Sequence, residues 1–403
     1  MVRRPVVGVV IAFSVVLTAI LVSGPAGAVV DSATIVPSSI PGSLDDGFSD
    51  VQCFSASNCL AVGFIDDGSS RRNLVAKWDG AAWSETPSPS PTSTGSFLNS
   101  VACVSASWCT AVGFADTNPV LETQAMIWDG STWSLVPTPN VPTASNELSS
   151  VSCASPTWCV AVGMTLISNA FENLAMSWNG SVWSIMSTPN PGALLHQLKS
   201  VSCTSPVSCV AIGYYSDGTI YHSLALQWDG NSWSVMPLLN VGTDSNFLFD
   251  VSCIAPTSCT AIGYYGNGSV YQTLILHWDG SAWAAVASPN VGSRSNELNS
   301  VSCISETSCV AVGNSETGQT IVALVMAWDG RAWSIVSSPT VDGELNYLHA
   351  VSCASQYSCM AVGRLESPTT AAFRTFAMAL TGSVPSPPTT VVPVEPSVPV
   401  FTG

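Results

Sequence analysis

The cysteines are the residues whose spacing most directly suggests chemistry. All 14 cysteines fall into Cys-x5-Cys pairs, and the pairs recur every 50 residues without a single shift in position. Such thiols could bind a metal ion or form disulfides. Zinc sites favour closer pairs that are completed by a second pair or by histidines. Here the four histidines occupy different repeat positions: His196, His222, His277 and His349.

A disulfide within each pair is therefore the predicted chemistry, and neither a metal site nor a cofactor is expected. A short loop between two strands brings the two Cβ atoms near bonding distance. In an oxidising compartment, free thiols would be a liability. The predicted bridges are Cys53-Cys59, Cys103-Cys109, Cys153-Cys159, Cys203-Cys209, Cys253-Cys259, Cys303-Cys309 and Cys353-Cys359.

The tyrosines are the second group with functional promise. Six of the 8 tyrosines crowd two hairpins in the fourth and fifth repeats, namely Tyr214, Tyr215, Tyr221, Tyr264, Tyr265 and Tyr271. Tyrosine provides amphipathic contact area at low entropic cost, which favours binding of a glycan or a protein. The alternative interpretation is that these residues form cross-strand pairs that only stabilise their hairpins.

The charge balance excludes one class of partner. The chain has 10 basic and 26 acidic residues, for a net charge of -16. Phosphate binding requires a basic surface, so a nucleic-acid partner is not expected. Only 9 % of the residues are charged.

Both ends of the chain differ from the repeats. Arg3 and Arg4, an apolar run from 6 to 22, and Ala26-Gly27-Ala28 predict a secretory signal over 1–28, with an uncleaved anchor as the alternative. Residues 382–403 are rich in Pro, Val, Ser and Thr, which predicts an extended, disordered tail. We expect a secreted or cell-surface monomer with no stable membrane insertion once the signal is cleaved.

Each repeat divides into four short strand-like runs. In the fifth repeat, the runs start near Leu248, Cys259, Val270 and Trp283, and Asn267-Gly268 supplies a strong hairpin signal between the second and third. Four strands in a unit of this length are typical of a β-propeller blade. The sequence therefore predicts an all-β, seven-bladed propeller over 33–381.

The two ends of the repeat region predict how the ring closes. The seventh repeat stops after its third strand, near Leu380. The missing outer strand is present at the other end of the chain, because Ala33-Thr34-Ile35-Val36 aligns without gaps with Trp333-Ser334-Ile335-Val336. An N-terminal strand over 33–38 that completes blade seven would close the ring and hide its edges.

The turn between the third and fourth runs carries a resemblance. Six repeats contain Trp-Asp-Gly-x-x-Trp, with Asn179 in place of Asp in the third. This motif resembles the Asp-box of sialidase-type propellers, one residue shorter, and the overall plan is similar to secreted kelch-like propellers. The resemblance implies turn-stabilising roles, away from any substrate, for the motif aspartates: Asp79, Asp129, Asp229, Asp279 and Asp329.

Catalytic signals are weak. A sialidase-like hydrolase or a lyase with a site in the central funnel would need clustered arginines or carboxylates. Arg364 could approach Arg71 if the first and seventh repeats adjoin. As a Ca²⁺ site, Asp66-Asp67-Gly68 has too few carboxylates. No catalytic residue is assigned. A binding or scaffold propeller, which uses its variable rim loops, is the preferred hypothesis.

Overall fold

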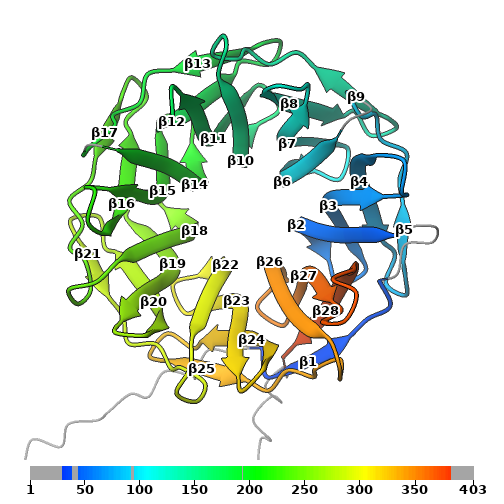
Figure 1. The fold of residues 1–403 in the computed structure, drawn as a ribbon, viewed down its shortest axis with the longest axis vertical. Helices are drawn as coiled ribbons and strands as arrows, with labels where there is room; N and C mark the ends of the chain where they lie inside the picture. Colours follow the sequence, from blue (N-terminus) through cyan, green and yellow to red (C-terminus); the bar gives the residue numbers. More distant parts are fainter. Residues whose placement is uncertain (1–29, 39–43, 92–94, 193, 383–403) are drawn as a thin grey trace, which may run out of the picture.

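The computed structural model describes residues 30–38, 44–91, 95–192 and 194–382. The predicted signal over 1–28 and nearly all of the predicted tail lie outside these residues. Strands make up most of the described part of the chain and form seven four-stranded antiparallel blades around a common axis (Figure 1), two of which are joined into one eight-stranded sheet. No helix that could cross a membrane occurs among the described residues.

Blades one to four follow one another along the chain. Blade one contains β2 (Asp45–Ser55), β3 (Asn58–Asp66), β4 (Arg71–Trp78) and β5 (Trp83–Glu85). Blade two contains β6 (Ser96–Ser105), β7 (Trp108–Asp116), β8 (Leu121–Trp128) and β9 (Trp133–Val136). Blade three contains β10 (Ser145–Ser155), β11 (Trp158–Ile167), β12 (Ala170–Trp178) and β13 (Trp183–Met186). Blade four contains β14 (Leu195–Ser205), β15 (Ser208–Ser216), β16 (Tyr221–Trp228) and β17 (Trp233–Val235). A single parallel pairing, between Phe171 and Leu195, links blades three and four.

Blades five to seven complete the arrangement. Blade five contains β18 (Asn246–Ala255), β19 (Ser258–Asn267), β20 (Val270–Trp278) and β21 (Trp283–Ala285). Blade six contains β22 (Asn296–Ser305), β23 (Ser308–Thr317), β24 (Thr320–Trp328) and β25 (Trp333–Val336). Blade seven contains β26 (Leu345–Ser355), β27 (Ser358–Glu366), β28 (Phe373–Thr381) and β1 (Ser32–Ile35). The first strand of blade five starts two residues before the predicted Leu248, and β1 is shorter than the predicted 33–38.

The outer strand of blade seven comes from the N-terminal side of the chain. β1 pairs antiparallel with β28, and Ala33 lies opposite Leu380. In blade six the equivalent pair is Trp333 and Trp328. The register of the sequence alignment is thus the register of the structure, with Leu380 in the place of the missing tryptophan. Phe48 and Val362 belong to one buried cluster, so blades one and seven also pack together.

A glycine in the second strand of every blade lets the first strand pass close by. A Cβ atom built on Gly263 would lie 2.0 Å from the carbonyl oxygen of Phe247. Directly after this contact, β18 has an irregular register between Leu248 and Asp250. Phe247 and Leu248 face opposite sides of the sheet, as successive residues of a strand do. Leu248 is fully buried in the core.

All seven predicted cysteine pairs form disulfides, with Cα–Cα distances of 3.9 to 4.0 Å. Each bridge joins the first and second strands of one blade. No described cysteine is free. Seven disulfides indicate an oxidising setting.

The aspartates of the Trp-Asp-Gly turns stabilise the turns themselves. In blade five, Asp279 Oδ1 accepts hydrogen bonds from the backbone N–H groups of Ser281 and Ala282 at 2.8 and 2.9 Å. The adjacent Gly280 has a φ of 92°, which L side chains rarely adopt. Trp278 donates from Nε1 to the carbonyl oxygen of Pro256 at 3.2 Å and thereby ties the turn to the disulfide loop.

Candidate binding site on the rim face

One layer of side chains covers the end of the blades opposite the disulfide loops. We call it the rim layer, and it takes one residue from each of the first three strands of every blade. The first- and second-strand members are paired directly across the sheet. The members are Gly47, Phe64 and Arg71; Phe97, Phe114 and Leu121; Glu147, Met164 and Phe171; Gln197, Tyr214 and Tyr221; Phe247, Tyr264 and Tyr271; Glu297, Asn314 and Ile321; and Tyr347, Arg364 and Phe373.

Aromatic rings of blades four and five meet in this layer. Phe247 lies between the two blades, with ring centroids 5.1 Å from Tyr214, 4.9 Å from Tyr221 and 5.1 Å from Tyr264. Tyr264 contacts Tyr271 at 4.8 Å. Because each ring contacts the next, the cluster is one continuous surface across the two blades.

Phe249 extends this cluster toward the axis. Its ring lies 5.2 Å from that of Tyr264 and 6.2 Å from that of Tyr214. We call these six residues the aromatic sector: Tyr214, Tyr221, Phe247, Phe249, Tyr264 and Tyr271. The sector is partly buried, and Tyr271 is its most exposed member at 41 %.

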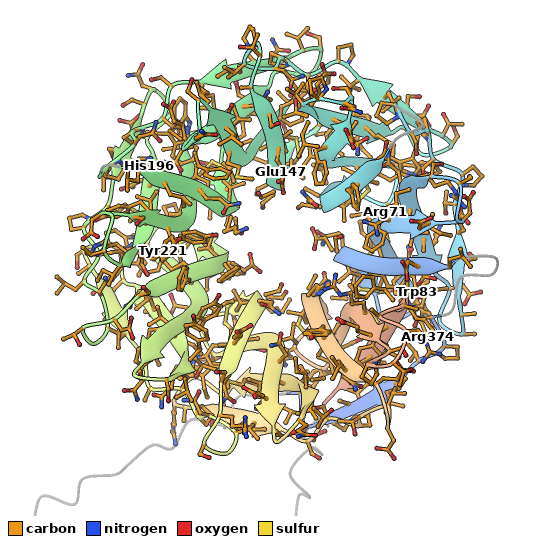
Figure 2. The ribbon with its side chains drawn as sticks, viewed as in Figure 1. Arg71, Trp83, Glu147, His196, Tyr221 and Arg374 are labelled. Carbon is orange, nitrogen blue, oxygen red and sulfur yellow. A yellow bond between two sulfur atoms is a disulfide. The ribbon has the colours of Figure 1, made fainter. Side chains whose placement is uncertain are left out.

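A lysine borders the aromatic sector. Lys199 Nζ lies 5.7 Å from the ring centroid of Phe249 and 5.9 Å from that of Tyr214. Burial lowers the pKa of Lys199, and the charge of Glu147 partly opposes this. Burial likewise raises the pKa of Glu147, which lies near the inner side of the ring in Figure 2. Burial also raises the pKa of Tyr214 to about 12, so its hydroxyl stays protonated at neutral pH.

The six predicted tyrosines divide into two sets. Tyr214, Tyr221, Tyr264 and Tyr271 lie together in the rim layer, whereas Tyr215 and Tyr265 do not join them. Successive residues of a strand face opposite sides of the sheet, and both tyrosines pack against buried clusters between blades. The ring of Tyr215 stacks on His222 at 5.0 Å, and Tyr265 donates its hydroxyl to Gln272 Oε1 at 2.8 Å.

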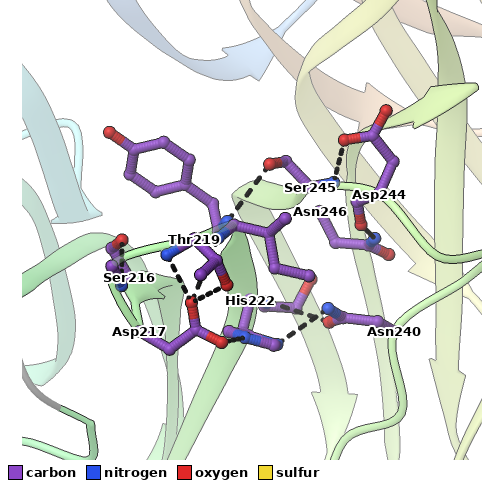
Figure 3. A network of polar contacts seen from close by, with 12 residues as sticks. Ser216, Asp217, Thr219, His222, Asn240, Asp244, Ser245 and Asn246 are labelled. Carbon is purple, nitrogen blue, oxygen red and sulfur yellow. Dashed lines mark hydrogen bonds and ion pairs between the residues drawn. The ribbon is translucent and has the colours of Figure 1, made fainter. Parts of the chain in front are cut away.

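A polar network holds the hairpin that carries Tyr221 (Figure 3). His222 Nε2 lies 2.8 Å from Asp217 Oδ2, and His222 Nδ1 lies 2.9 Å from the amide nitrogen of Asn240. The backbone N–H of Tyr221 donates to Ser245 Oγ at 3.1 Å. The tip of the hairpin is therefore joined to the connection between blades four and five. Hydrogen bonds from Thr219 and His222 hold the pKa of Asp217 well below its usual range.

Arg71 and Arg364, the two arginines expected to approach each other, have separate partners. Arg71 pairs with Asp66 at 3.2 Å and lies 5.6 Å from the ring centroid of Phe64. Arg364 lies over the ring of Phe373 at 4.3 Å. Asp67 accepts hydrogen bonds from Ser69 and Ser70, which leaves this turn self-contained. No group of three or more potential metal ligands occurs in the part of the chain that the structure describes.

The axis is lined by serines, valines and two aspartates rather than by an evident catalytic pair. A cavity of 320 Å³ lies there. In six of the blades, a Ser or Asp side chain accepts a hydrogen bond from the backbone N–H of a valine in the next blade. The pairs are Asp50 with Val101 at 2.9 Å, Ser100 with Val151 at 3.2 Å, Ser150 with Val201 at 3.3 Å, Ser200 with Val251 at 3.4 Å, Asp250 with Val301 at 2.8 Å and Ser300 with Val351 at 3.2 Å.

The seventh position of this ring is Ala350, which has no side-chain acceptor. Asp50 compensates, because its Oδ1 accepts from Val51 N at 2.8 Å while its Oδ2 accepts from Val101 N. Burial raises the pKa of Asp50 to about 7, against the opposing effect of its N–H and hydroxyl donors. Burial also raises the pKa of Asp250. Both carboxylates thus serve as structural acceptors between blades.

Sequence reasoning missed part of the aromatic sector. Phe247 and Phe249 lie on the first strand of blade five, to which sequence reasoning assigned no binding residue. The signal was present, because Phe-Leu-Phe alternates at these positions. Lys199 was missed for the same reason, since it shares a repeat position with Phe249.

The chain matches no protein-family model and no curated protein. It does match solved structures. YCF48 bound to D1 peptide has a TM-score of 0.53 at 14 % identity, covering 89 % of this chain and 99 % of that one. A protein of unknown function from Dyadobacter fermentans has a TM-score of 0.53 at 8 % identity, covering 89 % and 100 %. An ulvan lyase bound to -[GlcA(1-4)Rha3S]- has a TM-score of 0.52 at 10 % identity, covering 88 % and 95 %. At these identities the likeness shows the fold alone, a β-propeller.

Proposed function

We propose that this chain is a secreted binding propeller that recognises a glycan or a protein through the aromatic sector of blades four and five. The observation that carries the proposal is the continuous contact of six aromatic rings on one face, at the junction of two blades. A pair of tyrosines that only stabilised its own hairpin would not need Phe247, which contacts rings of both blades.

The composition of the sector suits recognition. Tyrosine rings supply apolar contact area, and their hydroxyls supply hydrogen-bonding groups at the edge. Tyr214 donates its hydroxyl to Gln197 Oε1 at 2.6 Å, so this ring is held in one orientation. A ligand would therefore meet a largely preorganised surface, which lowers the entropic cost of binding.

The enzymatic alternative has less support. A hydrolase or lyase at the axis would need carboxylates that are free to exchange protons with a substrate. Asp250 instead accepts from two serine hydroxyls and two backbone N–H groups, at 2.6 to 2.9 Å. Asp50 is held by Ser100, Val51 and Val101 in the same manner.

The test is a double substitution, Tyr221→Ser with Tyr271→Ser, in the secreted chain. Both side chains are at the outer end of the sector, so the core should be retained. Loss of one aromatic contact at a binding hot spot costs about 2 kcal/mol or more. The double variant should therefore bind at least about a hundredfold more weakly, measured on glycan arrays and peptide arrays that retain the wild-type chain.

The matched control is Tyr357→Ser, which makes the same change in the β26–β27 loop at the opposite end of blade seven. This control should bind as the wild type does. If the double variant melts at a lower temperature but binds normally, the tyrosines are hairpin pairs and the proposal is wrong.

A further inference from the structure

A cavity between blades five and six lies away from the rim layer. Its volume is 490 Å³, and its lining includes Trp328 and Trp333 of blade six and the disulfide Cys303–Cys309. Blade five contributes His277 and Asp279 from the opposite side. A cavity of this size and mixed lining is within the range of small-molecule sites.

A related cavity, which shares five repeat positions of its lining with the first, lies between blades three and four. Its volume is 510 Å³, and Trp228 and Trp233 occupy the repeat positions of Trp328 and Trp333. Ser177 takes the place of His277. We call these two sites the tryptophan grooves. A third, smaller cavity of 320 Å³ lies beside Trp78, but this indole is only 4 % exposed, so we assign no site there.

Side chains of the preceding blade decide whether a groove opens. At the junction of blades two and three, the positions of Ser258 and His277 are taken by Trp108 and Ile127, which pack against the core beside Trp178. The open groove between blades three and four also has a tryptophan, Trp158, at the first of these positions, so Ile127 is the side chain that distinguishes the closed junction from that groove. Trp178 is 5 % exposed, whereas Trp228 and Trp328 are half-buried. The filled junction is thus a natural model for a closed groove.

The groove between blades five and six also contains polar groups without partners. Asp279 Oδ1 accepts the hydrogen bonds of the Trp-Asp-Gly turn. Its Oδ2 accepts no hydrogen bond from the described residues, and the ring of His277 forms none with them. Hydrogen bonds from Ser281 and Ala282 lower the pKa of Asp279 to about 2, so the carboxylate stays ionised. These groups are available to a ligand.

We propose that the tryptophan grooves bind pyranose sugars. The C–H groups of a pyranose carry partial positive charge and pack against the negative face of an indole. Its hydroxyls would reach Asp279 and Ser305 in one groove, and Ser177 and Asn231 in the other. Neither lining contains Lys or Arg, which disfavours an anionic ligand.

The comparison of the two grooves argues against a cationic ligand. Asp279 and Glu306 beside Trp328 could attract an ammonium group. The groove at Trp228 has no carboxylate and carries hydroxyls and the amide of Asn231 instead. Tryptophan with hydroxyl or amide partners is what the grooves share, and this favours a neutral polyol.

Two equivalent sites on one molecule would act together. A polymer or surface that displays many copies of one sugar could occupy both grooves, and the second contact would then form at a high effective concentration. Weak binding of a single sugar in each groove would thus produce firm attachment to a sugar-coated surface.

Saturation-transfer NMR tests the proposal with the methyl glycosides of glucose, galactose, mannose and N-acetylglucosamine, and with choline for comparison. The decisive variant is Ser258→Trp with His277→Ile and Ser177→Ile, which copies the packing of the closed junction into both grooves. We expect transfer to at least one methyl glycoside and a tenfold or greater loss of it in the triple variant. The rim variant Tyr221→Ser/Tyr271→Ser should keep the part of the signal that the triple variant loses, which separates this site from the proposed rim site.

A measurement on the wild-type chain tests the proposal even if the triple variant misfolds. Oxidative footprinting should show that a bound glycoside protects Trp228 and Trp328. The proposal is overturned if no methyl glycoside gives transfer, if transfer survives in the folded triple variant, if choline alone binds, or if neither tryptophan is protected.

Discussion

Ala350 is the position in the axial ring of hydrogen bonds that has no side-chain acceptor, and it allows a sharp test of how neighbouring blades are held together. In the substitution Asp50→Ser, the new hydroxyl can still accept from Val101 N, as Ser100 accepts from Val151 N at 3.2 Å. It cannot also accept from Val51 N, which Asp50 Oδ1 now does at 2.8 Å. Since Ala350 has no acceptor, Val51 N–H would lose its partner. The second substitution, Ala350→Ser, would restore one.

The expected magnitude follows from this single lost partner. A buried N–H group without an acceptor costs about 1–3 kcal/mol. Asp50→Ser should therefore lower the free energy of unfolding by about this amount at pH 5, and Ala350→Ser should recover most of it in the double variant. In the wild-type background, Ala350→Ser should change little, because Val51 N already has its acceptor.

The pH dependence supplies an independent readout. The folded chain holds the Asp50 proton up to a pKa of about 7, whereas the unfolded chain releases it near its usual pKa of about 4. The stability that this group contributes is therefore complete below about pH 4 and is lost as the pH rises to about 7. Asp50→Ser should remove this contribution to the fall in the free energy of unfolding with rising pH, and should leave the contribution of Asp250.

The assay is denaturant unfolding at pH 5 and pH 8 with the disulfides intact. Because the repeats can unfold separately, coincidence of fluorescence and circular dichroism must be checked first. The reasoning is refuted if Ala350→Ser stabilises the wild type as much as it stabilises Asp50→Ser, since the two sites would then be uncoupled.

Three further results are expected. Deleting residues 30–38 removes β1, so β28 loses its partner and the melting temperature should fall; an unchanged melting temperature would contradict this role. Non-reducing mass mapping should find each bridge between cysteines six positions apart, as in Cys53–Cys59, and a dominant bridge between repeats would be inconsistent with the fold. Gly263→Ala should destabilise by about 1–3 kcal/mol or more, because its Cβ meets a carbonyl oxygen at 2.0 Å. Gly268→Ala, with no atom within 4 Å, should cost only about 1–2 kcal/mol.

Short-range patterns made much of the architecture predictable. The disulfide partners are six residues apart, and the turns at Asn267-Gly268 and Asp279-Gly280 depend on local backbone conformation. The role of β1 involves a pairing between opposite ends of the repeat region, as between Ala33 and Leu380. It was nevertheless predictable, because residues 33–36 align with Trp333–Val336, the outer strand of the sixth repeat.

The candidate site was only partly predictable. The strand positions of Tyr214 and Tyr264 were evident from the repeat, but which side of the sheet forms the rim layer depends on how the blades pack against one another. Because successive residues of a strand face opposite sides, Tyr215 and Tyr265 lie on the other side and pack against the clusters between blades. The contribution of Phe249 required knowledge of how β18 approaches blade four.

The sequence by itself determined the period, the blade, the disulfides and the pairing of the first and last strands of the repeat region, because each depends on local geometry or on a comparison of one repeat with another. Only the tertiary structure decided which side chains meet across blades. The aromatic sector, the exchange of hydrogen bonds around the axis and the two tryptophan grooves each join residues about 50 positions apart that no local pattern pairs. Whether a groove is open depends on the volume of one or two side chains, such as Ser177 or Ile127. That side chain fills the groove only because the tertiary structure places it beside the indole of the next blade.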